Sequence, residues 1–277
     1  MDHTRTSNRP IGSPVERLED LRFLRGRGEF VDDVPSPGAL HAVILRSSVA
    51  HGRLRAIDTT AALKRPGVRA VIAAQEIAGK AGGDIPVITM RQELLPEFKR
   101  YQQPVIASDK VRYVGEPIAV VVADSPALAE DALEHIALDI ETLPPVADRA
   151  AARSNQHVLF EATGRNHVIT LCAQKGDAEA AFRDAPYTRR ERFQVQRFTA
   201  VTMEPRGLLA QWDDAKQHLT VSGMTKVVFH NRRMLAQMMD LPEGAIRMVE
   251  NDVGGGFGAR GEFYPEDFLI PFAARLT

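Results

Sequence analysis

The chain has very little cysteine, no long apolar run and no excess of charge of one sign. Cys172 is the only cysteine among 277 residues, which excludes an internal disulfide and any iron–sulfur cluster or cysteine-rich zinc site held by this chain alone. No uninterrupted apolar run approaches the roughly 18 residues of a membrane-spanning helix. The formal net charge of −1 gives no electrostatic argument for binding to nucleic acid or to an anionic membrane surface.

The composition is that of an ordinary globular protein. Hydrophobic residues make up 44% of the chain and charged residues 26%, which is close to the average for folded domains. The length predicts about two domains. The polar N-terminus lacks the apolar core of a secretory signal, so we expect a cytoplasmic protein.

The first half of the chain alternates short strands and helices, which predicts a mixed α/β sheet. The continuous apolar run 118–123 is typical of a central strand. Ser125 and Pro126 then supply the cap and the first residue of a helix that reaches about His135. Further elements are expected as strands 40–45, 54–58, 68–72 and 137–141, a short helix ending at Leu63, and a long functional or interfacial loop over 79–104.

The second half is less regular. We expect a short helix 176–182 capped by Asp177, an exposed strand 187–195, and a hairpin formed by 208–212 and 218–221. A helix from Lys226 to Met239 and a strand 246–249 follow. The final helix, from Pro265 onward, carries an apolar face with no evident packing partner. This suggests that the chain is incomplete by itself, as a fragment or as one part of an interdigitated complex.

A glycine-rich loop at 252–261 is the most distinctive stretch. Four of the five residues 254–258 are glycine, and Phe257 is the exception. Consecutive backbone N–H groups in such a loop can form a concavity that binds anions. The loop also fits the dinucleotide pattern G-x-G-x-x-A, although no helix follows at once and no acidic residue follows about 20 positions later. A simple turn is the competing interpretation.

Several motifs, in order, resemble the molybdenum-binding subunit of the xanthine dehydrogenase/aldehyde oxidase family. The segments 25–33, 40–48, 111–117 and 120–141 look like the α/β hammerhead domain of this family. Thr202-Met-Glu-Pro-Arg-Gly207, the helix from Lys226 and the segment 252–258 look like the opening of its molybdopterin-binding region. The resemblance implies four parts: a flexible N-terminal arm (1–20), a hammerhead domain (21–148), a linker (149–170), and an incomplete start of the molybdopterin-binding domain (171–277).

The resemblance also implies which residues approach the cofactor. Gly255, Gly256, Phe257 and Gly258 would lie against molybdopterin, and the amide near Phe257 would approach an oxygen on molybdenum. Many members of the family have a glutamine where this chain has Lys226. A lysine there is open to two interpretations, a donor to an oxo ligand or a solvated residue at a helix start. The catalytic glutamate of the family has no counterpart here, so no catalytic residue and no protein ligand to a metal is expected.

These residues suggest part of a molybdenum hydroxylase that oxidises an N-heterocycle or an aldehyde with oxygen from water. The cofactor would be molybdopterin, in its cytosine dinucleotide form, and partner subunits would carry [2Fe-2S] clusters and FAD. A non-catalytic assembly subunit with the same fold but no molybdenum is the alternative from another class. A Rossmann-type nucleotide module is the third.

Overall fold

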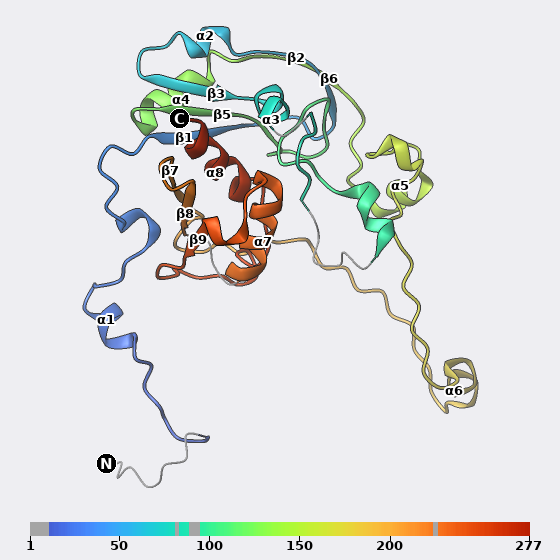
Figure 1. Cartoon of the computed structure of the whole chain (residues 1–277). Coiled ribbons are helices and arrows are strands. Elements are labelled where there is room, and N and C mark those ends of the chain that lie inside the picture. Colours follow the sequence, from blue (N-terminus) through green and yellow to red (C-terminus); the bar gives the residue numbers. More distant parts are fainter. Residues whose placement is uncertain (1–10, 81–82, 89–94, 224–226) are drawn as a thin grey trace.

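The computed structural model describes residues 11–80, 83–88, 95–223 and 227–277. Figure 1 shows a body built from helices and sheets, from which the N-terminal segment and a long arm extend. The helices are α1 (Asp20–Leu24), α2 (Thr60–Leu63), α3 (Ala74–Lys80), α4 (Pro126–Leu133), α5 (Arg149–Ser154), α6 (Ala178–Asp184), α7 (Val228–Met239) and α8 (Glu266–Leu276). None of the described helices has the length and apolar character needed to cross a membrane.

The first sheet has the order β1-β5-β3, and all of its pairings are antiparallel. Its strands are β1 (His41–Arg46), β3 (Val68–Ile72) and β5 (Pro117–Ala123). Every residue of the central strand β5 is buried, as the continuous apolar run predicts. Ser125 caps the helix that follows, because its side chain accepts a hydrogen bond from the Leu128 amide at 3.3 Å. The predicted central strand and the predicted cap are confirmed.

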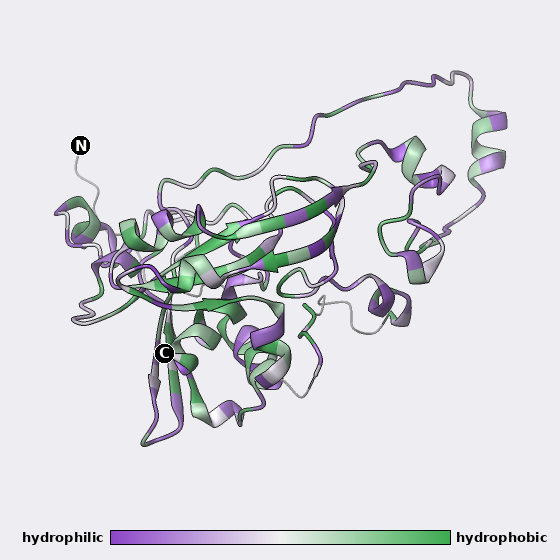
Figure 2. Ribbon diagram, turned by 90° about the horizontal axis from the view of Figure 1, so that it is seen from above, coloured by the Kyte–Doolittle hydropathy of each residue, from purple (hydrophilic) through white to green (hydrophobic). Residues whose placement is uncertain are grey.

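The two faces of β5 belong to two different cores. Ala119, Val121 and Ala123 pack with buried residues of α2 and α4. Val120 and Val122 pack on the opposite side, in a cluster that contains residues of α7, α8 and β8. Alternate residues of a strand point to opposite faces of its sheet, so one apolar run fills both cores. Figure 2 shows these strands as predominantly hydrophobic.

The second sheet has the order β4-β2-β6 and is also antiparallel. Its strands are β2 (Gly52–Asp58), β4 (Lys110–Val111) and β6 (Ala137–Thr142). A smaller core of Ala107, Val111 and Ile118 lies beside it. Gly52 has no room for a side chain, because a Cβ there would lie 2.6 Å from Ile140.

The third sheet has the order β7-β8-β9. Strand β7 (Leu209–Asp213) pairs antiparallel with β8 (His218–Ser222), and β8 pairs parallel with β9 (Ile246–Val249). Helix α7 is the crossover between the two parallel strands. The predicted hairpin, helix and strand are therefore confirmed, except that Lys226 lies outside the described residues.

Two expectations about loops and strands are corrected. The segment 79–104 is not a plain loop, because it begins inside α3 and contains a 3-10 helix, Pro96–Tyr101. The segment 187–195 is not a strand, since it takes part in no strand pairing within the described part of the chain. Its alternating pattern marks an extended backbone that lacks the hydrogen-bonding partner that a strand requires.

The expectation for the final helix is also wrong. Its apolar face already has a partner: Phe268, Leu269, Phe272 and Ala273 are buried in the same core as Leu219 and Val221. The rings of Phe268 and Phe272 stack with their centroids 5.5 Å apart. The sequence pattern shows that a face is apolar but not which strand covers it, and here β7, β8 and β5 do so.

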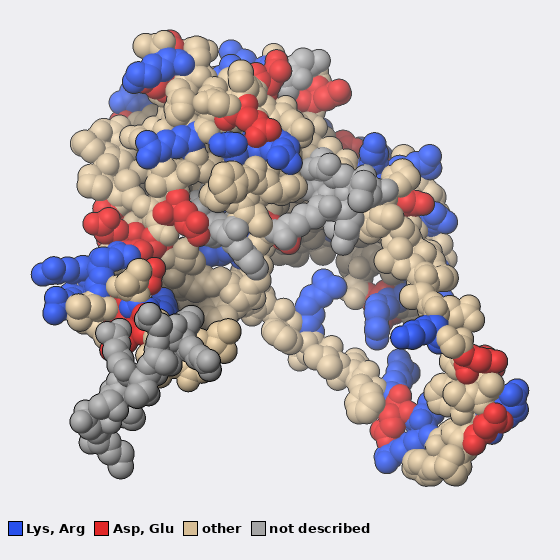
Figure 3. Space-filling view, turned by 60° about the horizontal axis from the view of Figure 1, so that its bottom comes forward, with Lys and Arg blue, Asp and Glu red and all other residues tan. Residues whose placement is uncertain are grey.

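The arm, residues 168–201, stands away from the body in Figures 1 and 2 and carries α6. Asp177 caps α6 as predicted, by accepting a hydrogen bond from the Ala180 amide at 2.9 Å. The arm exposes large apolar side chains, namely Leu171, Phe182, Tyr187, Phe193, Val195, Phe198 and Val201. Figure 3 shows Lys, Arg, Asp and Glu side chains gathered along the same arm.

Phe268→Ala tests the central position of α8 in the core. Phe268 is 1% exposed, and removing a buried phenylalanine ring costs roughly 3–5 kcal/mol. We expect the free energy of unfolding to fall by about that amount in chemical denaturation. Phe182→Ala is the matched control, because Phe182 lies on the arm and is 68% exposed; its effect should stay within about 0.5 kcal/mol. Equal effects of the two variants would contradict the assignment.

Candidate functional site

The glycine loop begins where two parallel strands end. β9 leads into it, and Gly223 follows the neighbouring strand β8. The Gly223 amide donates to the Val249 carbonyl at 3.2 Å, so the two carboxyl ends lie side by side. Ligands of open α/β sheets bind in the crevice outside such carboxyl ends. The topology therefore places the loop where a ligand is expected.

The structure explains most of the glycines in the loop. Gly255 and Gly258 have φ values of +110° and +92°, which side chains other than glycine rarely adopt. A Cβ on Gly254 would overlap the side chain of Glu204. Three of the four glycines in 254–258 are thus required by the backbone or by a close neighbour inside the chain.

Gly256 is the exception, because the fold gives no reason for it. Its φ is not positive, and a Cβ placed there would meet nothing within 4 Å. Glycine is also used where a backbone must come close to a ligand. The open space beside Gly256 therefore fits a bound group that needs the room of a missing side chain.

Phe257 has an unusual conformation for an aromatic residue. Its φ is +44° and its side chain is 82% exposed. Such a backbone costs on the order of 1–3 kcal/mol and tends to occur at ligand-binding sites. A Cβ on Gly255 would lie 2.8 Å from the Phe257 ring, so the neighbouring glycine allows the ring its position.

Glu204 anchors the start of the loop. Its carboxylate accepts a hydrogen bond from the Gly254 amide at 2.7 Å and pairs with Arg260 at 2.8 Å. Arg260, which is 6% exposed, also donates to the carbonyls of Glu204 and Pro205, at 2.6 and 3.2 Å. The loop is thus held between the segment 202–207 and its own Arg260. Sequence reasoning missed both anchors, although Glu204 lies inside the motif 202–207.

The end of the loop is attached to α8. The Tyr264 hydroxyl donates to the Ala259 carbonyl at 2.7 Å, and the Arg206 guanidinium lies 3.9 Å from the centre of the Tyr264 ring. Arg206 also pairs with Asp267 at 2.9 Å and with Glu266 at 3.3 Å. Glu266 in turn pairs with Arg46 of β1. The network connects the glycine loop to the first sheet.

Two neighbouring carboxyls in this network have opposite pKa shifts. Burial raises the pKa of Asp267 to about 6, against the opposing effect of Arg206. Burial also acts on Glu266, but the hydrogen bond from Arg46 and the charge of Arg206 outweigh it and lower the pKa of Glu266. The two pKa shifts differ because the carboxyls have different surroundings. Asp267 is 1% exposed and pairs with one arginine, whereas Glu266 pairs with two.

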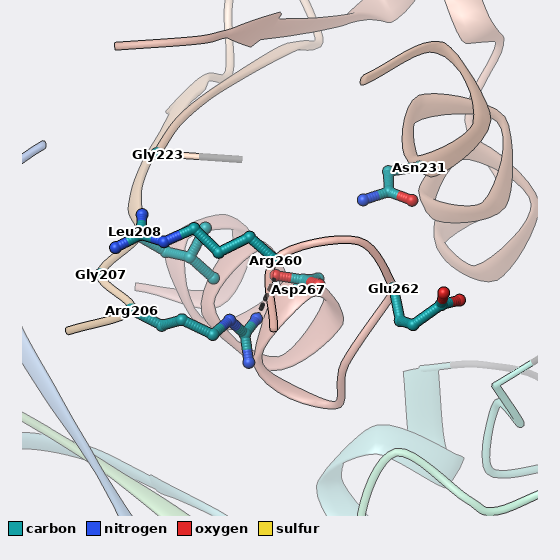
Figure 4. Close-up of a pocket in the computed structure, with 8 residues that line it drawn as sticks. All are labelled: Arg206, Gly207, Leu208, Gly223, Asn231, Arg260, Glu262 and Asp267. Atoms are coloured by element: carbon teal, nitrogen blue, oxygen red, sulfur yellow. Dashed lines mark hydrogen bonds and ion pairs between the residues drawn. The ribbon is translucent and has the colours of Figure 1, made fainter. Parts of the chain in front are cut away.

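A small cavity lies behind the loop (Figure 4). Its volume is about 20 Å³, which suits about one water molecule and is far below the hundreds of Å³ of a cofactor pocket. Two buried atoms here lack a hydrogen-bond partner among the described residues, Oδ1 of Asn231 and Nε of Arg260. The lining residues are Arg206, Gly207, Leu208, Gly223, Asn231, Arg260, Glu262 and Asp267.

The sequence-predicted residues fall into two groups. Gly255, Gly256, Phe257 and Gly258 form one continuous loop, whereas Lys226 lies outside the described residues. Within the described ranges, no group of three or more His, Cys, Asp or Glu residues could hold a metal ion. Residues 254–258 of the loop therefore offer a ligand backbone N–H and C=O groups and the ring of Phe257.

Two family models match most of the chain between them. A model of the molybdopterin cofactor-binding domain matches residues 159–277, and a model of the a/b hammerhead domain of aldehyde oxidase and xanthine dehydrogenase matches residues 25–144. The fold and the loop thus define a chain that combines a hammerhead domain with molybdopterin-binding sequence. The chain resembles the N-terminal part of the molybdopterin-binding subunit of the xanthine dehydrogenase/aldehyde oxidase family.

Similar proteins are much longer than this chain. It is 38% identical over 265 residues to the 6-hydroxypseudooxynicotine dehydrogenase complex subunit gamma of Paenarthrobacter nicotinovorans, covering 96% of this chain and 33% of that protein. The nicotine 6-hydroxylase large subunit of the same organism is 33% identical, with 96% and 32% covered. The crystal structure of quinoline 2-oxidoreductase from Pseudomonas putida 86 matches with a TM-score of 0.83 at 33% identity, covering 96% and 33%. The chain spans about a third of these relatives.

The raised pKa of Asp267 predicts a pH dependence of stability. The native state holds this proton up to about pH 6, whereas an unfolded aspartate releases it near pH 4. Stability from this group is therefore lost as the pH rises between those values. Between pH 4.5 and 7, unfolding free energies from urea titration should fall by about 2 kcal/mol more in the wild type than in Asp267→Asn. Parallel pH profiles would contradict the assignment.

Proposed function

We propose that this chain supplies one wall of the molybdopterin site of a molybdenum hydroxylase. The observation that carries the proposal is Gly256, whose missing side chain leaves open space that nothing in the fold requires. The loop around it has the positive-φ backbone of an anion-binding concavity. The match of molybdopterin-binding sequence to 159–277 supports the same conclusion.

In this proposal the residues of the loop bind and orient the cofactor. Backbone amides of Gly255, Gly256 and Gly258 would donate hydrogen bonds to oxygen atoms of the cofactor. The ring of Phe257 would shield these hydrogen bonds from water. Lys226, on the segment before α7, would donate to the same region. The bound cofactor, molybdopterin in its cytosine dinucleotide form with molybdenum, would supply the redox chemistry. The protein supplies position and electrostatics.

The proposed substrate class is an N-heterocycle, oxidised with oxygen from water. The names of the similar proteins support this choice, since they refer to nicotine, a pseudooxynicotine and quinoline. Other relatives are a carbon monoxide dehydrogenase chain and an aldehyde oxidoreductase, so an aldehyde is the alternative substrate. Electrons would leave through [2Fe-2S] and FAD groups on partner subunits.

We further propose that the site is completed by polypeptide that corresponds to the remaining length of the relatives. The arm supports this, because its extended backbone has no strand partner among the described residues and its apolar side chains are exposed. Phe193 and Val195 are among them, with side chains 83% and 80% exposed. Unpaired backbone groups with apolar neighbours are the features by which a segment adds to the edge of another sheet.

Gly256→Ala tests the role of the loop. We expect the complex purified through this chain to lose most of its molybdenum and cytosine nucleotide, because a methyl group would fill the space kept for the cofactor. Thermal unfolding of the cofactor-free protein should not change, since the methyl meets no protein atom within 4 Å. Metal analysis and nucleotide release measure the first effect, and calorimetry measures the second.

Two other glycines give controls for this variant. Gly244→Ala also meets nothing within 4 Å but lies outside the loop, so it should keep the wild-type molybdenum content. Gly254→Ala would overlap Glu204 and should lower both the cofactor content and the unfolding temperature. Wild-type molybdenum content in Gly256→Ala would show that the loop is a turn. A wild-type complex without molybdenum would favour the assembly-subunit alternative.

A further inference from the structure

A segment from the N-terminal side of the chain lies across the start of the glycine loop. Arg22, on α1, donates hydrogen bonds from Nη1 and Nη2 of its guanidinium to Oδ2 and Oδ1 of Asp252, the second at 2.6 Å. The Glu29 amide donates to Oδ2 of the same carboxylate at 2.6 Å. In return, the Asp252 amide donates to the Glu29 carbonyl at 3.0 Å. The first residue of the loop is thus fixed from both its side chain and its backbone.

The same segment reaches the end of β8. A Cβ on Gly223 would lie 2.9 Å from the Val31 side chain and 2.5 Å from the Gly207 carbonyl. A Cβ on Gly207 would also lie 2.9 Å from Val31. The chain from Arg22 to Val31 therefore passes over the carboxyl ends of both parallel strands, where the candidate site lies.

The contact between Arg22 and Asp252 differs from an ordinary surface ion pair. The Asp252 side chain is 15% exposed and accepts three hydrogen bonds. Bidentate arginine–carboxylate pairs fix geometry as well as charge. The hydrogen bonds from Arg22 and from the Glu29 amide lower the pKa of Asp252 to about 2, because they stabilise its ionised form.

We propose that Arg22 is a positioning residue for the cofactor, acting through Asp252 on the conformation of residues 253–258; this rests on the proposed function above. The loop needs such support because it contains three residues with positive φ and glycines, which lose much conformational entropy on ordering. Glu204 holds the loop at Gly254 from one side. Arg22 holds it at Asp252 from the other, before the cofactor arrives. A loop fixed in advance loses less entropy on binding.

The test compares how fast variants of the intact purified complex lose molybdenum during buffer exchange. Residues that orient a binding group change its affinity by roughly 10–100-fold when substituted, and we expect Arg22→Gln and Asp252→Asn to lose molybdenum faster by a factor in that range. Arg22→Lys should resemble Arg22→Gln, because an ammonium cannot reproduce the bidentate geometry. The double variant Arg22→Gln/Asp252→Asn should lose molybdenum no faster than the more affected single variant.

Arg69→Gln is the matched control. Arg69 makes a bidentate but more exposed pair with Asp124, at 2.7 and 2.9 Å, on the first sheet and away from the loop. Its removal should leave the rate of molybdenum loss unchanged. If Arg69→Gln and Arg22→Gln lower the unfolding temperature by the same amount, that shared effect is due to the loss of an ion pair alone.

A second measurement uses the unaltered protein. If the loop and the segment are coupled, the bound cofactor must stabilise the contact as much as the contact stabilises the cofactor. The Glu29 amide should therefore exchange its hydrogen more slowly in the loaded complex than after the cofactor has been removed, while the Ala180 amide of the arm stays unchanged. A merely structural contact would give the same Glu29 rate in both.

The outcomes separate the two proposals. A wild-type complex that holds neither molybdenum nor pterin overturns the proposed function. A loaded wild-type complex, together with wild-type rates of molybdenum loss in Arg22→Gln and Asp252→Asn, overturns the positioning role and leaves the proposed function standing. If Arg22→Gln fails to fold, the comparison of Glu29 exchange decides the matter.

Discussion

The burial of β5 on both faces is the constraint on which the rest of the structure depends. One face of this strand belongs to the core with α2 and α4, and the other to the core with α7, α8 and β8. The first sheet and the part of the chain that carries α7, α8 and β8 therefore pack directly against each other through one face of β5. The glycine loop follows β9 in the sheet that is packed against this face. A polar residue in β5 would leave an unpaired group in one of the two cores, which is costly.

A series of ion pairs connects the first sheet to the glycine loop. Arg46 of β1 meets Glu266 at the start of α8, and Arg206 joins Glu266 and Asp267 to the segment that holds Glu204. The carboxylate of Glu204 then fixes Gly254. Most members of the network have more than one partner, so its geometry is better determined than that of isolated surface pairs. The loop is thus anchored at both ends by contacts with the body, while the side chain of Phe257 remains exposed.

Much of the fold was predictable from the sequence. The apolar run 118–123, the Ser125 cap and the Asp177 cap are local signals, and local geometry decides them. The glycine loop was recognisable from its composition, and the order of the motifs indicated the family. The anchors were not predictable in the same way. Glu204 and Asp252 are ordinary acidic residues in the sequence, and their partners Arg260 and Arg22 lie 56 and 230 positions away. The periodic patterns of a sequence indicate helices and strands, and they do not predict contacts between residues so far apart in the chain.

The sequence by itself determined the short elements, their caps, the glycine loop and the family, because each depends on neighbouring residues or on a pattern of motifs. Tertiary structure alone decided which surfaces are covered. The apolar face of α8 is buried against strands of the same chain. The segment 187–195 also has a regular apolar pattern, but it has no strand partner among the described residues. Hydrophobic patterning states that a surface needs a partner, and only the packed chain shows whether that partner is present. The same holds for Gly256, since open space around a glycine is a property of the fold and not of the sequence.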